Sequence, residues 1–227
     1  GWTTLTALAQ ATTRLRLGTL VTGIHHRHPA VLANMAAALD IISGGRLELG
    51  IGAGWNEEES DAYGIELGSI TERFDRFEEA CQVLIGLLSQ DTTDFDGRYY
   101  QLKEARCEPK PVQKPYPPIV IGGSGEQLTL RVVARHADVW NFGGSDPQEF
   151  KRKQGILKEH CDAVGRDFSE ITLSVQMQVF PDDLQKTTDG LQGLVDAGAT
   201  HLSLNIRPPY PDKIVTRVAE EVIPKVS

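Results

Sequence analysis

The chain has 227 residues, of which 40% are hydrophobic and 24% charged, a balance that excludes a disordered protein. Its formal net charge of −8 disfavours nucleic acid or an anionic membrane as the main partner, and no apolar run approaches the roughly 20 residues of a membrane helix. Three widely spaced cysteines, Cys81, Cys107 and Cys161, indicate reduced thiols and therefore a cytoplasmic protein, without a disulfide framework or a zinc site.

Segments typical of helices and of strands alternate along the chain. Pro29 suits the first turn of a helix, and Gly44 and Gly45 suit its end. Apolar periodicity and such end signals predict helices near 5–13, 30–43, 71–88, 126–135, 147–164, 183–197 and from 211 onward. They predict strands near 15–21, 46–52, 119–121, 138–140, 171–179 and 201–206.

Because a helix follows each predicted strand, we expect parallel strands with right-handed crossovers. The fold class is therefore α/β, and we predict a (β/α)8 TIM barrel, a single domain over residues 1–227. The alternative, a doubly wound open sheet, lacks a convincing GxGxxG turn. The chain starts without Met and without a leading strand, so we expect a barrel that lacks its first two strands.

A long insertion separates the strand that ends at Gly52 from the strand that begins at Ile119. It holds one long helix and a hairpin over residues 95–100, with Asp96 and Gly97 at the turn. Insertions of this length in a barrel are usually lids or interface elements.

A glycine-rich segment follows the predicted strand at 119–121. Gly122, Gly123, Ser124 and Gly125 leave backbone N–H groups open to an anion, and the next helix adds a favourable dipole. These residues predict a phosphate cradle. The alternative is a tight turn that needs a positive φ angle.

Small residues also end the strand at 46–52. Ala53 and Gly54 leave room for a flat ring, Trp55 is placed to form a wall, and Glu58 is available to a ligand. The competing interpretation is that Trp55 packs in the core and that the acidic run is the solvated start of a helix.

Two further strand ends carry polar side chains. His25, His26, Arg27 and His28 lack the H-x3-H spacing of common zinc sites, so we predict a loop at the mouth and no metal. Trp140 and Asn141 end another strand and are candidates to line a substrate pocket. No nucleophile motif accompanies them, so we expect a cofactor to carry the chemistry.

The ordered motifs "LGTLVTG", "RHPAVLANMAAALDIISGGRLELGIGAGWNEEE", "FDGRYYQL" and "PPIVIGGSGEQ" resemble the luciferase-like monooxygenase superfamily, especially its branch that uses the deazaflavin coenzyme F-420. The resemblance is dense from Leu5 to Asn141 and covers only general architecture beyond it. It implies a barrel that holds a flavin or deazaflavin near its mouth, and a homodimer.

The resemblance also implies cofactor-binding residues. Leu20, Val21 and Thr22 would form a bulge, often with a non-prolyl cis peptide, that supports the ring. Ala53, Gly54 and Trp55 would flank the ring, while the segment 122–125 would hold the phosphate. Trp55 stands where some deazaflavin members place a glutamate, and the second strand of the family, which often ends in a polar residue, does not match here. No catalytic acid or base is assigned.

Three functions are compatible with this pattern. The first is an F-420-dependent oxidoreductase that transfers hydride to or from a small organic molecule. The second is a reduced-FMN monooxygenase that activates oxygen on the same barrel. The third is a flavin-binding or structural homologue without turnover. The substrate is read by loops and is not predicted.

Overall fold

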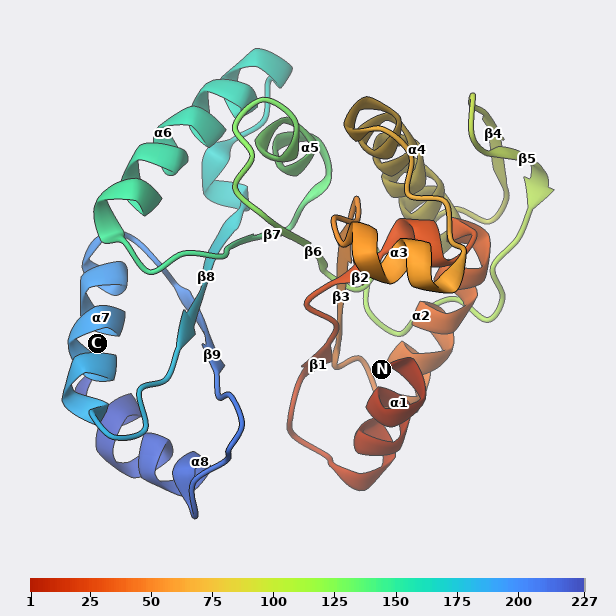
Figure 1. The fold of residues 1–227 in the computed structure, drawn as a ribbon. Coiled ribbons are helices and arrows are strands. Elements are labelled where there is room, and N and C mark those ends of the chain that lie inside the picture. The colour runs from red at the N-terminus through yellow and green to blue at the C-terminus, as the bar shows by residue number, and fades with distance from the viewer. Residues whose placement is uncertain (227) are drawn as a thin grey trace. The chain divides into compact units, whose positions relative to one another are not determined.

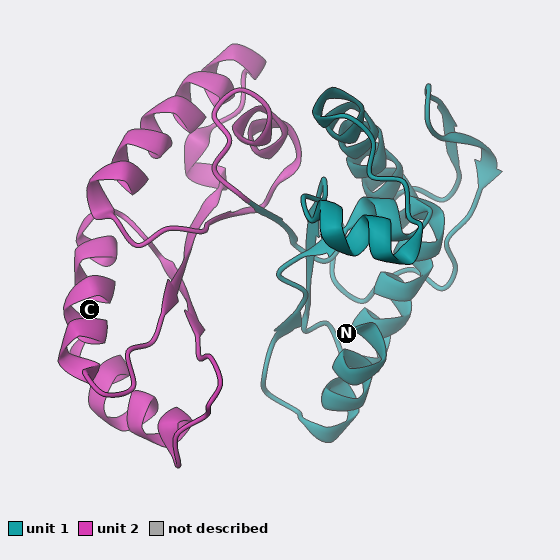
Figure 2. Cartoon of the chain, in the orientation of Figure 1, with its two compact units in different colours: residues 1–122 teal, residues 123–227 magenta. Residues whose placement is uncertain are grey.

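The computed structural model describes residues 1–226 and divides the chain into two compact units, residues 1–122 (unit 1) and residues 123–227 (unit 2), coloured separately in Figure 2. Each unit is an α/β assembly of parallel strands and helices (Figure 1). In the described part of the chain, no helix combines the length and apolar character needed to cross a membrane.

Unit 1 consists of α1 (Trp2–Ala11), β1 (Leu17–Gly18), β2 (Thr22–Gly23), the 3-10 helix η1 (Ile24–His26), α2 (Pro29–Ser43), β3 (Leu47–Gly52), α3 (Glu57–Tyr63), α4 (Ile70–Ser89), β4 (Thr93–Asp96), β5 (Gln101–Ala105) and β6 (Ile119–Gly122). Unit 2 consists of α5 (Thr129–His136), β7 (Val139–Phe142), α6 (Pro147–Val164), η2 (Phe168–Glu170), β8 (Thr172–Gln178), α7 (Leu184–Asp196), β9 (His201–Asn205) and α8 (Ile214–Arg217), which continues as a π turn and a 3-10 turn to Lys225.

Strand β3 is the centre of unit 1. It pairs in parallel with β1, β2 and β6, and its apolar residues Leu47, Leu49 and Ile51 are fully buried. Helix α2 packs on β3 and on α4. Because all of these strands run in parallel, the glycine-rich ends of β2, β3 and β6 meet at one edge of the sheet, where ligands bind in such folds.

Local signals account for the start of α4 and for the hairpin after it. Ser69 and Glu72 form a capping box, in which each side chain binds the backbone N–H of the other residue. Further along α4, the carboxylate of Glu79 accepts hydrogen bonds from the N–H groups of residues 98, 99 and 100, at 2.8, 2.8 and 3.1 Å. This carboxylate ties the β4–β5 hairpin to the helix.

The sheet of unit 2 has one apolar and one polar face. Paired residues of parallel strands point to the same side, so Trp140, Phe142, Val175 and Met177 share a face. Helices α6 and α7 lie along the sheet of unit 2 (Figure 1) and cover that face. Trp140 stacks on Phe150 of α6 with ring centroids 5.5 Å apart, and the Met177 sulfur lies against Gly190 of α7. The opposite face carries Asn141, Ser174, Gln176, Gln178, His201, Ser203 and Asn205.

Four element predictions need correction. The strand predicted at 15–21 is two short strands, because the Thr19 hydroxyl donates to the Gly50 carbonyl at 2.7 Å and takes the place of a regular ladder bond. Helix α5 begins at Thr129, after a turn, and not at Glu126. The last helix is a single α turn at Ile214–Arg217. Helix α3, at the acidic run, adds a second helix to the insertion, which was predicted to hold one.

Candidate functional site

In unit 1, Val21 lies across the ends of β3 and β6. A Cβ atom built on Gly52 would lie 2.9 Å from the Val21 side chain, and one built on Gly122 would lie 3.3 Å from it. The peptide bond between Leu20 and Val21 is cis, the feature that the family resemblance associates with this position. Leu20 and Val21 remain 44% and 39% exposed, so these strand ends present an apolar surface of the kind that a flat ring needs.

The structure agrees with only part of what was predicted for residues 53–58, which follow β3. Ala53 is buried, and Gly54 adopts a positive φ of 89°, with the ring of His25 against it. Trp55 is 81% exposed, so it does not pack in the core as the competing interpretation proposed. Glu58 is exposed in the first turn of α3, whose N-cap is Asn56, and this is the solvated helix start proposed as the alternative to a ligand contact.

In unit 2, the segment from Gly123 to Glu126 is an open backbone loop. Gly123 has a φ of 121°, a value that side-chain-bearing residues rarely adopt, and a Cβ on Gly125 would lie 2.9 Å from the Thr129 hydroxyl. Among the described residues, no acceptor is bonded to the backbone N–H groups of Ser124, Gly125 and Glu126. Free N–H groups without side chains above them are what an oxyanion needs.

Hydrogen bonds to buried residues of β7 hold this loop. The Trp140 indole donates to the Gly123 carbonyl at 2.8 Å, and the Gly123 N–H donates to the Asn141 carbonyl at 3.0 Å. Both side chains are buried, with Trp140 fully enclosed. The structure therefore places Trp140 under the cradle and not on the wall of an open pocket, although both residues were predicted to line one.

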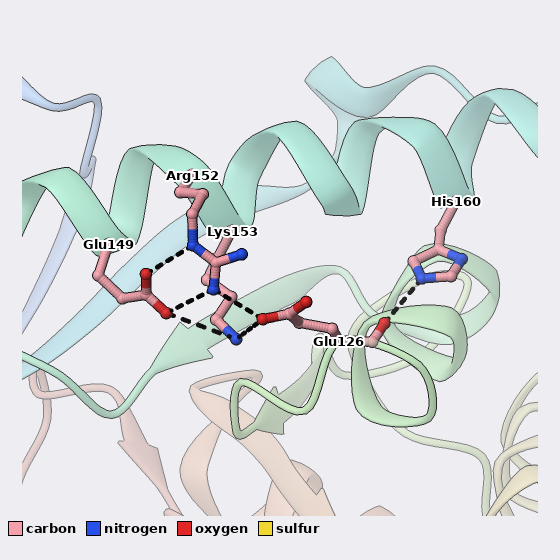
Figure 3. Close-up of polar contacts among 5 residues, drawn as sticks. All are labelled: Glu126, Glu149, Arg152, Lys153 and His160. Atoms are coloured by element: carbon pink, nitrogen blue, oxygen red, sulfur yellow. Dashed lines mark hydrogen bonds and ion pairs between the residues drawn. The ribbon is translucent and has the colours of Figure 1, made fainter.

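An ionic cluster holds the far side of the loop (Figure 3). The Glu126 carboxylate forms ion pairs with Arg152 and Lys153, with N···O distances of 2.6 and 2.7 Å. Both cations also form ion pairs with Glu149. The ring of His160 bonds to the Glu126 carbonyl at 2.8 Å. Hydrogen bonds from Arg152, and then from Lys153, lower the pKa of Glu126 to about 2, so its carboxylate is charged throughout the physiological range.

One feature that the sequence analysis missed is a row of polar side chains that runs across the sheet of unit 2. Asn141 donates to the Ser174 hydroxyl at 2.8 Å, and Ser174 bonds to His201 Nδ1 at 2.8 Å. The three residues are register partners on adjacent strands. The available signal was alternation: polar residues recur at every second position of β8 and β9, which predicts one polar face.

Comparison with known proteins adds independent information. The profile of the family described as luciferase-like monooxygenase matches residues 1–192. The curated "Uncharacterized protein Rv0940c" of Mycobacterium tuberculosis is 32% identical over 231 residues, which span 97% of this chain and 76% of the relative.

Two solved structures show the fold. The coenzyme F420-dependent tetrahydromethanopterin reductase of Methanopyrus kandleri superposes with a TM-score of 0.86 at 20% identity, over 100% of this chain and 87% of the other. The long-chain alkane monooxygenase LadA superposes with a TM-score of 0.81 at 15% identity, over 96% and 70%.

These likenesses confirm the predicted fold class, an α/β fold of the luciferase-like TIM-barrel type. The named structures are a reductase and a monooxygenase, and at 20% and 15% identity they show the fold alone. The family match over most of the chain confirms the resemblance seen in the motifs: the chain belongs to the luciferase-like monooxygenase family.

Proposed function

We propose that the protein is a flavin- or deazaflavin-dependent oxidoreductase that transfers hydride between reduced coenzyme F-420 and a small organic substrate. The observation that carries the proposal is the cradle of unit 2, where the N–H groups of Ser124, Gly125 and Glu126 have no acceptor within residues 1–226. The F420-dependent reductase that shares the fold supports a deazaflavin as the cofactor.

The residues present fit such a cofactor. Ser124, Gly125 and Glu126 would bind its phosphate through their backbone N–H groups, and Gly123, which has no side chain, would leave room for it, because a helix-preceding loop of this kind favours an oxyanion. Leu20, Val21, Thr22 and Gly122 would support the ring, together with the segment Ala53–Trp55. When bound, the reduced deazaflavin supplies a hydride; the chain orients the ring and excludes water from it.

A second candidate function is an FMN-dependent monooxygenase, which is favoured by the likeness to the long-chain alkane monooxygenase. Both cofactors carry a phosphate and a flat tricyclic ring, so the cradle and the apolar strand ends suit either. Their affinities separate the two functions. The proposal expects tight binding of F-420, whereas micromolar binding of FMN without binding of F-420 would reverse the order.

The cradle is tested by Gly123→Asp. At a φ of 121° an aspartate is strained, and its carboxylate would repel a phosphate held by the loop. We expect at least a tenfold loss of affinity for F-420 and FMN in absorbance and fluorescence titrations. The matched control is Gly155→Asp, which adds the same charge at an exposed position of α6 with open space around it. Equal affinity of both variants would remove the cradle assignment.

A further inference from the structure

Arg73 is a buried arginine with few hydrogen-bond and ion-pair partners. It lies on α4, its side chain is only 13% exposed, and its Nη1 donates one long hydrogen bond of 3.4 Å to the Gly54 carbonyl. Its nearest carboxylate is Glu57 at 3.8 Å, on a side chain that is 78% exposed. Its Nε is buried and has no partner among the described residues.

Arg46 shows how the same chain satisfies a structural arginine. Its guanidinium donates to the carbonyl groups of residues 9, 12, 15 and 43 at 2.6–2.9 Å, and also to the Thr12 hydroxyl. A guanidinium has five N–H donors, and burying its charge without partners destabilises a fold. The contrast shows that Arg73 does not serve the fold in the way that Arg46 does.

His25 lies beside the same glycine. A Cβ atom built on Gly54 would lie 2.5 Å from both Nδ1 and Cε1 of the His25 ring, and that Nδ1 is buried without a hydrogen-bond partner in the described part of the chain. Burial, and then the neighbouring His26, lowers the pKa of His25, so the ring is neutral at pH 7 and has one N–H to donate. Two orphaned nitrogen atoms, from η1 and from α4, therefore lie next to Gly54 at the end of β3.

We propose that His25 and Arg73 bind an oxyanion, a carboxylate or a phosphate, at the end of β3 next to Gly54. The planar fork of Arg73 suits the two oxygen atoms of such a group, and the imidazole adds a hydrogen bond that fixes its orientation. Arg76, one turn further along α4, adds a second positive charge near His25, while Glu57 and Glu59 oppose it. Glu57 is exposed and distant enough to give way to a ligand.

The oxyanion has two possible sources, and identifying it deepens the proposed function on which this step rests. One source is the acidic tail of the cofactor, and the other is an anionic substrate. The cradle at 123–125 belongs to unit 2, whereas His25 and Arg73 belong to unit 1, so the two sites can be removed separately.

The first test uses inorganic phosphate and acetate as probes, without any flavin. Dissociation constants come from thermal shifts at constant ionic strength, for the wild type, Arg73→Gln, Arg73→Lys and the control Arg16→Gln, whose side chain is 47% exposed and paired with Glu48. We expect at least tenfold weaker binding in Arg73→Gln, a smaller loss in Arg73→Lys and none in Arg16→Gln. Wild-type affinity in both Arg73 variants would overturn the proposal.

The second test identifies the source. F-420 and a deazaflavin without phosphate and glutamate tail are titrated into the wild type and into Arg73→Gln. A loss confined to F-420 assigns the oxyanion to the cofactor, whereas equal affinities in both proteins assign it to the substrate. Gly123→Asp separates this proposal from the proposed function, because it should weaken the flavin and leave acetate binding at Arg73 intact.

Discussion

Glu126 interacts with α6 through both its backbone and its charged side chain. Its carbonyl bonds to His160, and its carboxylate joins Arg152 to Lys153, a lysine that is only 8% exposed. A buried ammonium without this carboxylate would lose its shorter ion pair and keep only the contact of 3.5 Å with Glu149. The cluster therefore fixes the loop that carries the cradle, and it does so from a position that need not touch a ligand.

We expect Glu126→Gln to lower the melting temperature at pH 7. The pKa of Glu126 is held at about 2, below the free value of about 4.3, so its charge stabilises the folded state above that free value. This stabilisation is lost progressively as the pH falls from about 5 toward 2, and the two melting temperatures should converge over that range. Calorimetry across this range checks the sign, and the control is Glu159→Gln, an exposed carboxylate on α6, the helix that carries Arg152 and Lys153. A gap that does not vary with pH would mean that the carboxylate acts by shape alone.

At the level of single residues, the sequence identifies glycines better than it identifies aromatic side chains. Gly54 and Gly123 could be predicted, because an anion or a ring needs backbone without a Cβ and both glycines have positive φ. Trp55 and Trp140 could not be placed, because an aromatic ring suits both a pocket wall and a core. Trp140 is fully buried while Trp55 is 81% exposed, and only the three-dimensional neighbours decide between these outcomes.

At the level of elements, the β4–β5 hairpin depends on a contact that lies outside it. Two-stranded hairpins are marginal on their own, and the hydrogen bonds that three consecutive N–H groups donate to Glu79 provide an anchor on α4. The arginines 76 and 98 add cation–π contacts to Tyr99, at 5.3 and 5.2 Å from the ring centroid. The long insertion is therefore an ordered element of unit 1.

Replacing Glu79 with alanine should destabilise this element. Three backbone N–H groups would lose their acceptor, and we expect the free energy of unfolding to fall by about 2 kcal/mol. Urea unfolding followed by circular dichroism measures this loss, and limited proteolysis should show faster cleavage near the turn at Gly97. Asp91→Ala, at an exposed position just before the hairpin, is the control. If Glu79→Ala resembled this control, the anchor would have no energetic role.

The elements that could be predicted well from the sequence are helices with a proline at the start and a glycine directly after the end. Helices α2 and α6 begin at Pro29 and Pro147 and end before Gly44 and Gly165, both of which adopt left-handed φ. The strand predicted at 15–21 failed for the opposite reason. Its interruption depends on Gly50, a residue far along the chain, because a Cβ there would collide with the Thr19 carbonyl oxygen.

At the level of the whole molecule, the cysteines report on the integrity of both units. Cys81 and Cys107 lie in unit 1 and Cys161 lies in unit 2, and all three are at most 1% exposed. Burial is the first cause that raises each thiol pKa. The thiols should therefore be inert in the native state and reactive only where the structure opens.

Pulsed alkylation across a urea gradient, read by mass spectrometry, tests the predicted single domain. A cooperative domain should expose Cys81 and Cys161 at the same urea concentration, because two-state unfolding opens all buried sites together. Cys107, near a surface segment, provides an internal comparison within unit 1. Separate midpoints for Cys81 and Cys161 would instead show that the two compact units unfold independently, and the single-domain prediction would be wrong.

The exposure of Trp55 has an optical consequence. Of the three tryptophans, Trp140 is sealed in the core and Trp2 donates its indole N–H to the Thr22 hydroxyl at 3.0 Å, whereas Trp55 is largely in solvent. Emission from a solvated indole is red-shifted and open to quenching, while that of a sealed indole is neither. Trp55 is thus a native fluorophore next to Gly54. A yellow chromophore that bound at that strand end would absorb its emission.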